Sequence, residues 1–485
     1  MLVIGFAIFA MAARIPLDSD FWWHIRVGQA SVERGKPITL DIFSSTRSGE
    51  YWVNHSWLSQ VVLYMFYKLG GLRAVSGMVA IIAVSSIWFV YKQFQGTFLV
   101  KGVTVLLVAM VSSVVWTARP HIFSLLFLAI VSYVLYIYKY QQRNRLGWLL
   151  PVFVLWSNFH AGYPLGLILM AAFVGGEFVN KLTGWQRAEF MSWKQITRLG
   201  GMFIACGLIV LVNPNGIGMW TIPFQTVGIE ALQNLIGEWA SPDFHQVFQH
   251  PFIWLTIVTF GASGLSKRPL DGVELATFSI FFYGALVARR NFGPFALVIS
   301  PILDRHLSCV LLEWQARVRK KWPRLDQALS FRKESEQEIS PRLQKSLNIL
   351  VVTILFLGAV GKWVYVTRPS MIQEAEQQMF PVEAVEWVRE NRPPGKMFND
   401  YNWGGYLMWH LREYPVFIDG RTDLYGDPIL DEYIKILQVG NDFQQLVEKR
   451  DIGFFLLRKQ STLERLAREK YEVKRFQNST IILLK

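Results

Sequence analysis

The sequence predicts an α-helical polytopic membrane protein, a bundle of about 11–12 membrane segments with a small C-terminal α/β domain outside the membrane. Two observations lead to this fold class. Of the 485 residues, 52% are hydrophobic and 15% aromatic, with a mean hydropathy of +0.27. In addition, the apolar residues are gathered in long runs up to residue 366, whereas residues 371–485 alternate in short elements. We therefore expect a membrane domain over 1–368 and an extramembrane domain over 369–485.

Eleven apolar runs are candidates for membrane segments. Several of them fall short of the roughly 20 residues that a full crossing needs, so they reach full length only by including the polar motifs at their ends. For the first run, either Arg14 and Pro16 complete the span or the true start lies upstream; this run lacks the basic region and cleavage site of a signal peptide. The runs are 2–13, 75–91, 102–117, 121–138, 147–157, 164–180, 200–212, 251–265, 273–288, 291–303 and 347–366.

The formal charge of +13 follows the pattern of a membrane protein. Acidic and basic residues nearly balance in 371–485, so the excess lies in the membrane domain, where it marks loops as cytoplasmic. No basic stripe with interleaved aromatic residues remains for nucleic acid, and the two cysteines, Cys206 and Cys309, form no disulfide or zinc pattern. The basic loops contain Lys139, Arg143 and Arg145; Lys181, Arg187, Lys194 and Arg198; Lys267 and Arg268; and the stretch 304–345.

The polar motifs within the membrane boundary face the opposite side from these basic loops. Counting crossings from the loops places the motifs and the 369–485 domain together on the outer side. Scattered helix caps would be divided between the two faces, so this clustering indicates a functional site. The outward segments are 118–121, 156–162, 213–216, 236–242 and 288–291.

The first outer loop, 14–56, is amphipathic, and we expect one or two helices lying in the membrane interface. Segment 220–236 has a similar character. Three apolar stretches follow the loop, at 57–67, 75–91 and 102–117, although only two crossings are needed. One of the three must be interfacial, re-entrant or merged with its neighbour, and the sequence does not decide which.

The C-terminal domain alternates helices and strands. We expect helices at 381–391, 404–410, 428–438, 441–449 and 461–470, strands at 396–398, 414–418 and 453–458, and a terminal hairpin. Residues 304–345 precede the last membrane segment as a basic cytoplasmic linker, of which 320–345 is charged, low in apolar residues and partly disordered in our interpretation.

A set of motifs resembles a bacterial family of polytopic membrane proteins that is similar to the GT-C glycosyltransferases. The resemblance spans almost the whole chain. Its motifs are 18–24 (Asp-Ser-Asp-Phe-Trp-Trp-His), Gly28 to Ser44, 52–57 (Trp-Val-Asn-His-Ser-Trp), 119–121 (Arg-Pro-His), 156–162 (Trp-x-Asn-x-His-x-Gly) and 419–426 (Asp-Gly-Arg-Thr-Asp-Leu-Tyr-Gly). Residues 402–406 also resemble the acceptor-binding motif of oligosaccharyltransferases, but the Trp-Trp-Asp core of that motif is missing.

This resemblance implies transfer of a sugar from a polyprenyl-phosphate or polyprenyl-pyrophosphate donor on the outer side of the membrane. An acid of the first outer loop would serve as base or metal ligand, which matches Asp20 first and Asp18 second. These two are also the candidate ligands of a divalent metal ion. Trp22, Trp23 and His24 would contribute to substrate binding beside them.

The chemistry of such a transfer gives further candidates. A departing lipid phosphate needs fixed positive charge, best supplied by arginine. The substrate-binding candidates are therefore Arg119, Arg289 and Arg290, with His121, Asn158 and His160 in the same outward motifs.

Structural interpretations compete with each of these assignments. Each arginine could be a membrane anchor or an ion-pair partner of Glu238, and Glu238 itself is either a second catalytic acid or that partner. His160 could be an ordinary buried histidine, and a helix end with interfacial tryptophans could explain 18–24. Asp419, Arg421 and Asp423 fit a turn after a strand better than catalysis.

The combined interpretation is a glycosyltransferase of the bacterial cell envelope, a multi-pass protein of the cytoplasmic (inner) membrane. Its partners would be the lipid bilayer, a lipid-linked sugar and a glycan or protein acceptor. The alternative is a non-catalytic membrane assembly protein or a glycan carrier whose outer domain docks a partner. A carrier should show internal repeats and helices broken at the midplane, and no such repeat is evident. The sugar, the acceptor, metal dependence and oligomeric state are not determined by the sequence.

Overall fold

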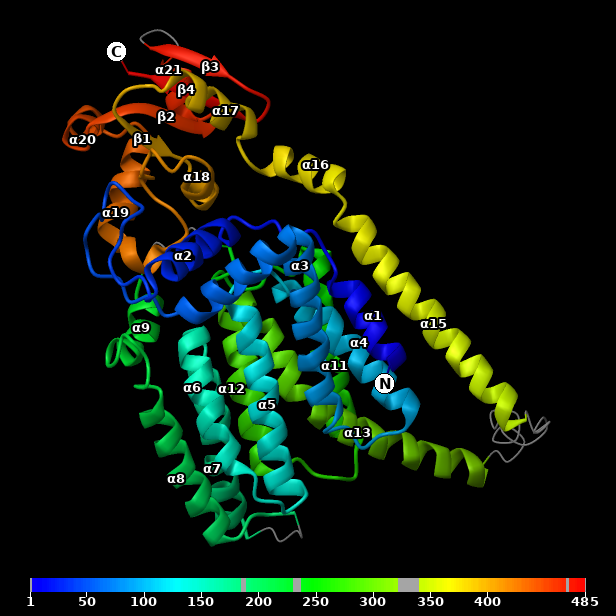
Figure 1. Ribbon diagram of the computed structural model, residues 1–485. Helices are drawn as coiled ribbons and strands as arrows, with labels where there is room; N and C mark the ends of the chain where they lie inside the picture. Colours follow the sequence, from blue (N-terminus) through cyan, green and yellow to red (C-terminus); the bar gives the residue numbers. More distant parts are fainter. Residues whose placement is uncertain (1, 185–188, 230–236, 322–339, 468–470, 485) are drawn as a thin grey trace.

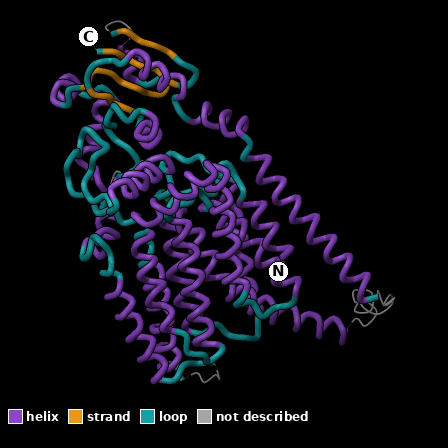
Figure 2. Tube along the Cα trace, viewed as in Figure 1, coloured by secondary structure: helices purple, strands orange, loops and turns teal. Residues whose placement is uncertain are grey.

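The computed structural model describes residues 2–184, 189–229, 237–321, 340–467 and 471–484. It is mostly helical: a long bundle carries a smaller mixed domain at one end (Figure 1), and the only strands in the described residues belong to that domain (Figure 2). This arrangement confirms the predicted fold class.

Within the described residues, six helical stretches are long and apolar enough to cross a membrane. They are α3 (Trp57–Tyr91), α4 (Phe98–Ser112) extended by a 3₁₀ turn to Val115, α5 (His121–Tyr140), α7 (Pro164–Leu182), α13 (Phe292–Lys321) with the turn before it, and α15 (Pro341–Val366). Shorter helices lie in the same bundle: α1 (Leu2–Ala12), α6 (Leu149–Phe159), α8 (Trp193–Ile209), α11 (His250–Leu265) and α12 (Gly272–Val287) (Figure 1). Each of the predicted apolar runs therefore falls largely within one helix.

The ambiguous stretch 57–67 belongs to the same helix as 75–91. Helix α3 contains both, with non-helical backbone at Gly70 and Gly71 between them. The first half packs closely on α2 (Phe21–Arg34): a Cβ added at Gly28 would lie 2.1 Å from the carbonyl oxygen of Gln60. Figure 1 shows this half beside α2 and the second half running into the bundle. Stretch 57–67 is thus merged with its neighbour.

The loop 14–56 contains one helix, α2, which ends at Gly35 in the left-handed conformation that favours glycine. The rest of the loop is irregular up to α3. Of the other segment expected to be interfacial, 220–236, residues up to Val227 belong to helix α9 (Gly218–Val227), whereas 230–236 lie outside the described residues.

The expected linker 304–345 begins as helix. Helix α13 continues to Lys321, and its residues Asp304, Arg305 and His306 are buried. Their charges are compensated inside the bundle: Asp304 accepts hydrogen bonds from the backbone of Gln95 and Gly96, and Arg305 donates to Glu274. Buried charged residues are tolerated when paired in this way, so the charges do not mark a loop here. Residues 322–339 lie outside the described residues.

The C-terminal domain contains a four-stranded sheet in the order β1-β2-β4-β3, with β1 parallel to β2 and the other pairs antiparallel. Its elements are α16 (Pro369–Met379), α17 (Val382–Asn391), β1 (Lys396–Asn399), α18 (Gly404–His410), α19 (Thr422–Leu437), α20 (Phe443–Lys449), β2 (Ile452–Arg458), α21 (Thr462–Ala467), β3 (Glu472–Arg475) and β4 (Ser479–Leu483). The predicted terminal hairpin corresponds to β3 and β4.

The strand predicted at 414–418 does not join this sheet. Its backbone is satisfied by other partners, because the side chain of Asn399 accepts a hydrogen bond from Phe417 and donates one to Ile418. Val416 instead forms an isolated parallel bridge with Ser44 of the first loop. The segment therefore joins the C-terminal domain to the membrane domain, at the end of the bundle where α2 lies (Figure 1).

Candidate functional site

Arg119 forms ion pairs with three carboxylates at the end of the bundle that carries the C-terminal domain. Its Nε donates to Asp18 Oδ1 at 2.6 Å. Its Nη1 lies 2.9 Å from Asp20 Oδ2 and 3.1 Å from Glu238 Oε1. Three separate segments of the chain therefore meet at one guanidinium.

Local structure explains how each segment reaches this point. Asp20 directly precedes α2, and its backbone N–H donates to the side chain of Asp18. Arg119 stands in the turn before α5, where Pro120 occupies the cap position. Glu238 is fixed through its backbone, because its carbonyl oxygen accepts from Arg290 N at 3.2 Å.

The three acids differ in exposure and in charge. The side chains of Asp18, Asp20 and Glu238 are 12%, 20% and 39% exposed. Burial raises the pKa of Asp20 to about 7; Arg119 opposes this shift, and the carboxylates of Asp18 and Glu238 add to it. Burial lowers the pKa of Arg119, but the carboxylates of Asp20, Asp18 and Glu238 outweigh burial and raise this pKa above its ordinary value, so Arg119 stays protonated. Asp20 can therefore change its protonation state near neutral pH.

Arg290 lies beside this cluster in a different electrostatic setting. Its guanidinium carbon is 4.2 Å from the ring centroid of Trp239, and within the described residues it has no ion-pair partner of the kind Arg119 has. Arg289, its neighbour, lies close to Gly237, where an added Cβ would be 2.8 Å from Arg289 Nη2. Arg119 thus has three carboxylate partners, whereas Arg290 forms no ion pair with any described residue, and Glu238 acts on its charge only from a longer distance.

Histidines surround the two arginines. His24 lies against the Trp23 ring, with centroids 3.5 Å apart, and burial, followed by the charges of Arg119, His55 and His121, holds the pKa of His24 well below its usual range. His121 Nε2 is 2.8 Å from the carbonyl oxygen of Val115. His160 Nδ1 pairs with the hydroxyl of Ser124 at 2.8 Å, and its ring is 5.8 Å from that of His55.

Two of the proposed substrate-binding residues, Trp22 and Asn158, have extensive contacts within the protein. Trp22 is buried against the C-terminal domain, with its ring centroid 5.5 Å from that of Tyr406 and 5.1 Å from that of His410. Asn158 uses its full hydrogen-bonding capacity on the protein: its oxygen accepts from Trp57 and Asn213, and its amide nitrogen donates to two backbone carbonyls.

Sequence reasoning missed the part that the C-terminal domain plays at this site. Gly420 lies directly over Asp20, since an added Cβ would be 1.9 Å from Asp20 Oδ1. The flanking Arg421 pairs with both Asp419 and Asp41, and all three side chains are fully buried. The motif 419–426 could have signalled this contact, because it is shared with the resembled family, but charges after a strand were interpreted as a turn.

No group of three or more His, Cys, Asp or Glu side chains in the part of the chain that the structure describes is arranged to hold a metal ion. Asp18 and Asp20, the candidate ligands, both contact Arg119. A divalent ion bound there would have to share these carboxylates with the guanidinium.

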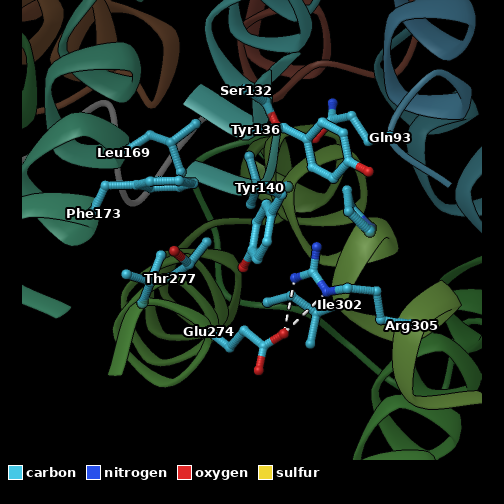
Figure 3. A pocket seen from close by; sticks show the side chains of 13 residues that line it. Gln93, Ser132, Tyr136, Tyr140, Leu169, Phe173, Glu274, Thr277, Ile302 and Arg305 are labelled. Carbon is cyan, nitrogen blue, oxygen red and sulfur yellow. Dashed lines mark hydrogen bonds and ion pairs between the residues drawn. The ribbon is translucent and has the colours of Figure 1, made fainter. Parts of the chain in front are cut away.

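A second polar cluster lies at the far end of the bundle. Arg305 donates hydrogen bonds to Glu274 beside a small pocket, which Figure 3 shows in close view. Tyr140, also at this pocket, is the last residue of α5, whereas Arg119 precedes the first; 20 helical residues separate the two by roughly 30 Å. Lys139, Glu177 and Asp271 form a buried ion-pair group nearby. This cluster is separate from the Arg119 site.

Comparison with solved structures shows which fold this is. The oligosaccharyltransferase of Archaeoglobus fulgidus in its apo form matches with a TM-score of 0.60 and 13% identity, over 94% of this chain and 69% of that chain. The chain has a GT-C-like fold. The archaeal oligosaccharyltransferase AglB in complex with an inhibitory peptide and a dolichol-phosphate matches with a TM-score of 0.61 and 11% identity, over 94% and 69%. ArnT from Cupriavidus metallidurans in the apo state gives 0.50 and 12%, over 99% and 96%.

The sequence itself matches no protein-family model and no curated protein. At 11–13% identity the similarity to these glycosyltransferases is one of fold, so the chemistry has to be argued from the residues of this chain.

Proposed function

We propose that this protein is a membrane glycosyltransferase that moves a sugar from a polyprenyl-phosphate-type donor to an acceptor, with Asp20 as the general base. The observation that carries the proposal is the meeting of Asp18, Asp20 and Glu238 on Arg119 at one end of the bundle. Ionisable residues buried within a membrane bundle are rare and usually mark a functional site, and these charges are largely buried at the end of such a bundle. In an inverting transfer a carboxylate takes the proton of the acceptor hydroxyl or amide as that group attacks the anomeric carbon.

The three acids divide this task. A base works best when its pKa is near the working pH, and Asp20, with a pKa of about 7, meets this condition. Asp18 orients the loop through the backbone of Asp20 and anchors Arg119. Glu238 is the most exposed of the three and can contact the acceptor. If a divalent ion takes part, Asp18 and Asp20 would hold it, and it would neutralise charge on the leaving phosphate.

The donor phosphate is assigned to Arg290 rather than Arg119. Arg119 already forms ion pairs with three carboxylates. Arg290, in contrast, stacks on Trp239 and forms no ion pair among the described residues. Its planar fork suits phosphate oxygens, and we assign Arg289, His24, His121 and His160 to the same binding region. The AglB structure with a dolichol-phosphate supports a lipid phosphate as the donor group in this fold.

Binding of undecaprenyl phosphate tests this assignment. Replacing Arg290 by Gln removes a charge-assisted contact of about 1.5–3 kcal/mol, so the affinity should fall on the order of 10- to 100-fold. Arg145→Gln, in the exposed loop at the other end of α5, is the matched control. Affinities of the two variants would be compared by native mass spectrometry in nanodiscs. Equal affinities would remove the lipid phosphate from this site and leave the non-catalytic alternative standing.

The site is proposed to face the outer side of a bacterial cytoplasmic membrane. Among the described residues, the Lys/Arg-rich connections after α5, α7 and α11 lie at the end of the bundle away from the C-terminal domain (Figure 1), and such loops stay in the cytoplasm. In intact cells, an impermeant thiol reagent should therefore label a cysteine placed at position 431, where the native Asp431 is exposed, and spare one at 330. Labelling with the reverse pattern would contradict the outward orientation.

A further inference from the structure

The loop that carries the acids lies between two glycines of the C-terminal domain. A Cβ added at Gly405, in α18, would lie 2.7 Å from the carbonyl oxygen of Ser19 and 3.1 Å from Trp23 N. A Cβ added at Gly420, before α19, would lie 1.9 Å from Asp20 Oδ1 and 2.8 Å from Trp23 Nε1. Backbone from two separate elements thus approaches residues 19–23 more closely than any side chain would allow.

Space, and not backbone conformation, is the reason for glycine at these two positions. Gly395 and Gly426 of the same domain have positive φ angles, which favour glycine. Gly405 and Gly420 do not have positive φ angles, so an alanine could adopt their backbone conformation. Its methyl group, however, would collide with the acid loop.

The turn at Gly420 cannot withdraw easily. Asp419 and Arg421 flank it and are fully buried, and Arg421 Nη1 lies 2.6 Å from Asp41 Oδ1 in the first loop. The two segments that carry Gly405 and Gly420 also pack on each other, since a Cβ added at Gly404 would lie 2.2 Å from the carbonyl oxygen of Ile418. Breaking a buried ion pair is costly, so the turn at Gly420 should stay in close contact with Asp20.

We propose that Gly405 and Gly420 are positioning residues. Through them, the C-terminal domain holds the Asp20 carboxylate in the orientation in which it pairs with Arg119 and which transfer requires. This inference rests on the proposed function, in which Asp20 is the base. It gives the C-terminal domain a role in the chemistry in addition to any contact with the acceptor.

The first test replaces Gly420 by Ala in the full-length protein. The methyl group must displace either the carboxylate of Asp20 or the turn, and a misplacement of about 1 Å can cost on the order of 100-fold in rate. We expect kcat to fall by about that factor, with KM for the lipid donor nearly unchanged because the phosphate contacts lie elsewhere. The matched control is Gly440→Ala, where the added Cβ meets only ordinary contacts of 3.4 Å or more. A kcat equal to that of the control would overturn the proposal.

The second test does not depend on activity. The unfolding temperatures of Gly420→Ala, Asp20→Ala and the double variant form a mutant cycle. If the methyl group collides with the Asp20 carboxylate, Gly420→Ala should lower the unfolding temperature less when Asp20 is already Ala. Strictly additive effects would overturn the positioning role while leaving the proposed function intact. If the wild-type protein transferred no sugar at all, the proposed function would fail whatever the cycle showed.

Discussion

Replacement of Asp20 by Asn is expected to lower the rate of sugar transfer by about 10²–10⁴-fold, the usual loss when a general base is removed. Asn has nearly the same shape as Asp, so it should keep the contacts under Gly420 and leave the protein folded and inserted. Arg119 retains Asp18 and Glu238 as partners, so the site should not collapse. The measurement is product formation from a polyprenyl-phosphate-linked sugar by purified protein.

Two further variants show whether this loss is specific. Asp18→Asn should have a smaller effect, because Asp18 supports the loop through the backbone of Asp20. Asp243→Asn, with a side chain that is 47% exposed, should leave the rate unchanged. Normal transfer by the Asp20 variant, at wild-type expression, would contradict the assignment of Asp20 as base.

Arg421→Gln is expected to cost about 3–5 kcal/mol of stability, the range measured when one partner of a buried ion pair is removed. The variant would leave Asp41 and Asp419 buried without their counter-charge. Burial alone disfavours ionisation of Asp41, but Arg421, together with hydrogen bonds from Ser44 and Phe43, outweighs burial, so the pKa of Asp41 lies below its ordinary value. Loss of Arg421 removes that compensation, and because the pair joins the two domains, the C-terminal domain should undock.

Thermal unfolding in detergent and limited proteolysis of the C-terminal domain measure this effect. Lys474→Gln is the control, since Lys474 and Glu472 form a pair whose side chains are 44% and 51% exposed. Such a surface pair contributes about 0–1 kcal/mol. An Arg421 variant as stable as this control would show that the network does not hold the domains together.

Much of the fold could be predicted from the sequence because its signals are local. Apolar runs become helices in a membrane wherever they occur, since each backbone polar group must be paired within the segment. The helix at 382–391, the strand at 396–399 and the terminal hairpin likewise follow from local patterns. The gathering of polar motifs at one end of the bundle followed from counting charges in loops.

What could not be predicted depends on partners distant in sequence. The charges of Asp304, Arg305 and His306 indicated a loop, because their compensation by the 95–96 backbone and by Glu274 is visible only in three dimensions. Segment 414–418 has the pattern of a strand, but Ser44, more than 370 residues away, provides its bridge. The same holds at the site: sequence reasoning named Asp20 and Arg119, whereas the approach of Gly420 to Asp20 depends on domain docking.

The pH dependence of transfer by the wild-type protein tests the central claim most directly. Only the ionised form of Asp20 can accept the proton of the acceptor, and burial raises its pKa to about 7. The rate should therefore rise about tenfold per pH unit below this value and level off above it. The Asp18→Asn variant lacks one of the carboxylates that raise the pKa of Asp20, so its limb should move to lower pH, with a lower plateau. A rate that is flat or falling between about pH 5 and pH 8, or the absence of any transfer, would contradict a reaction that depends on Asp20 as its base.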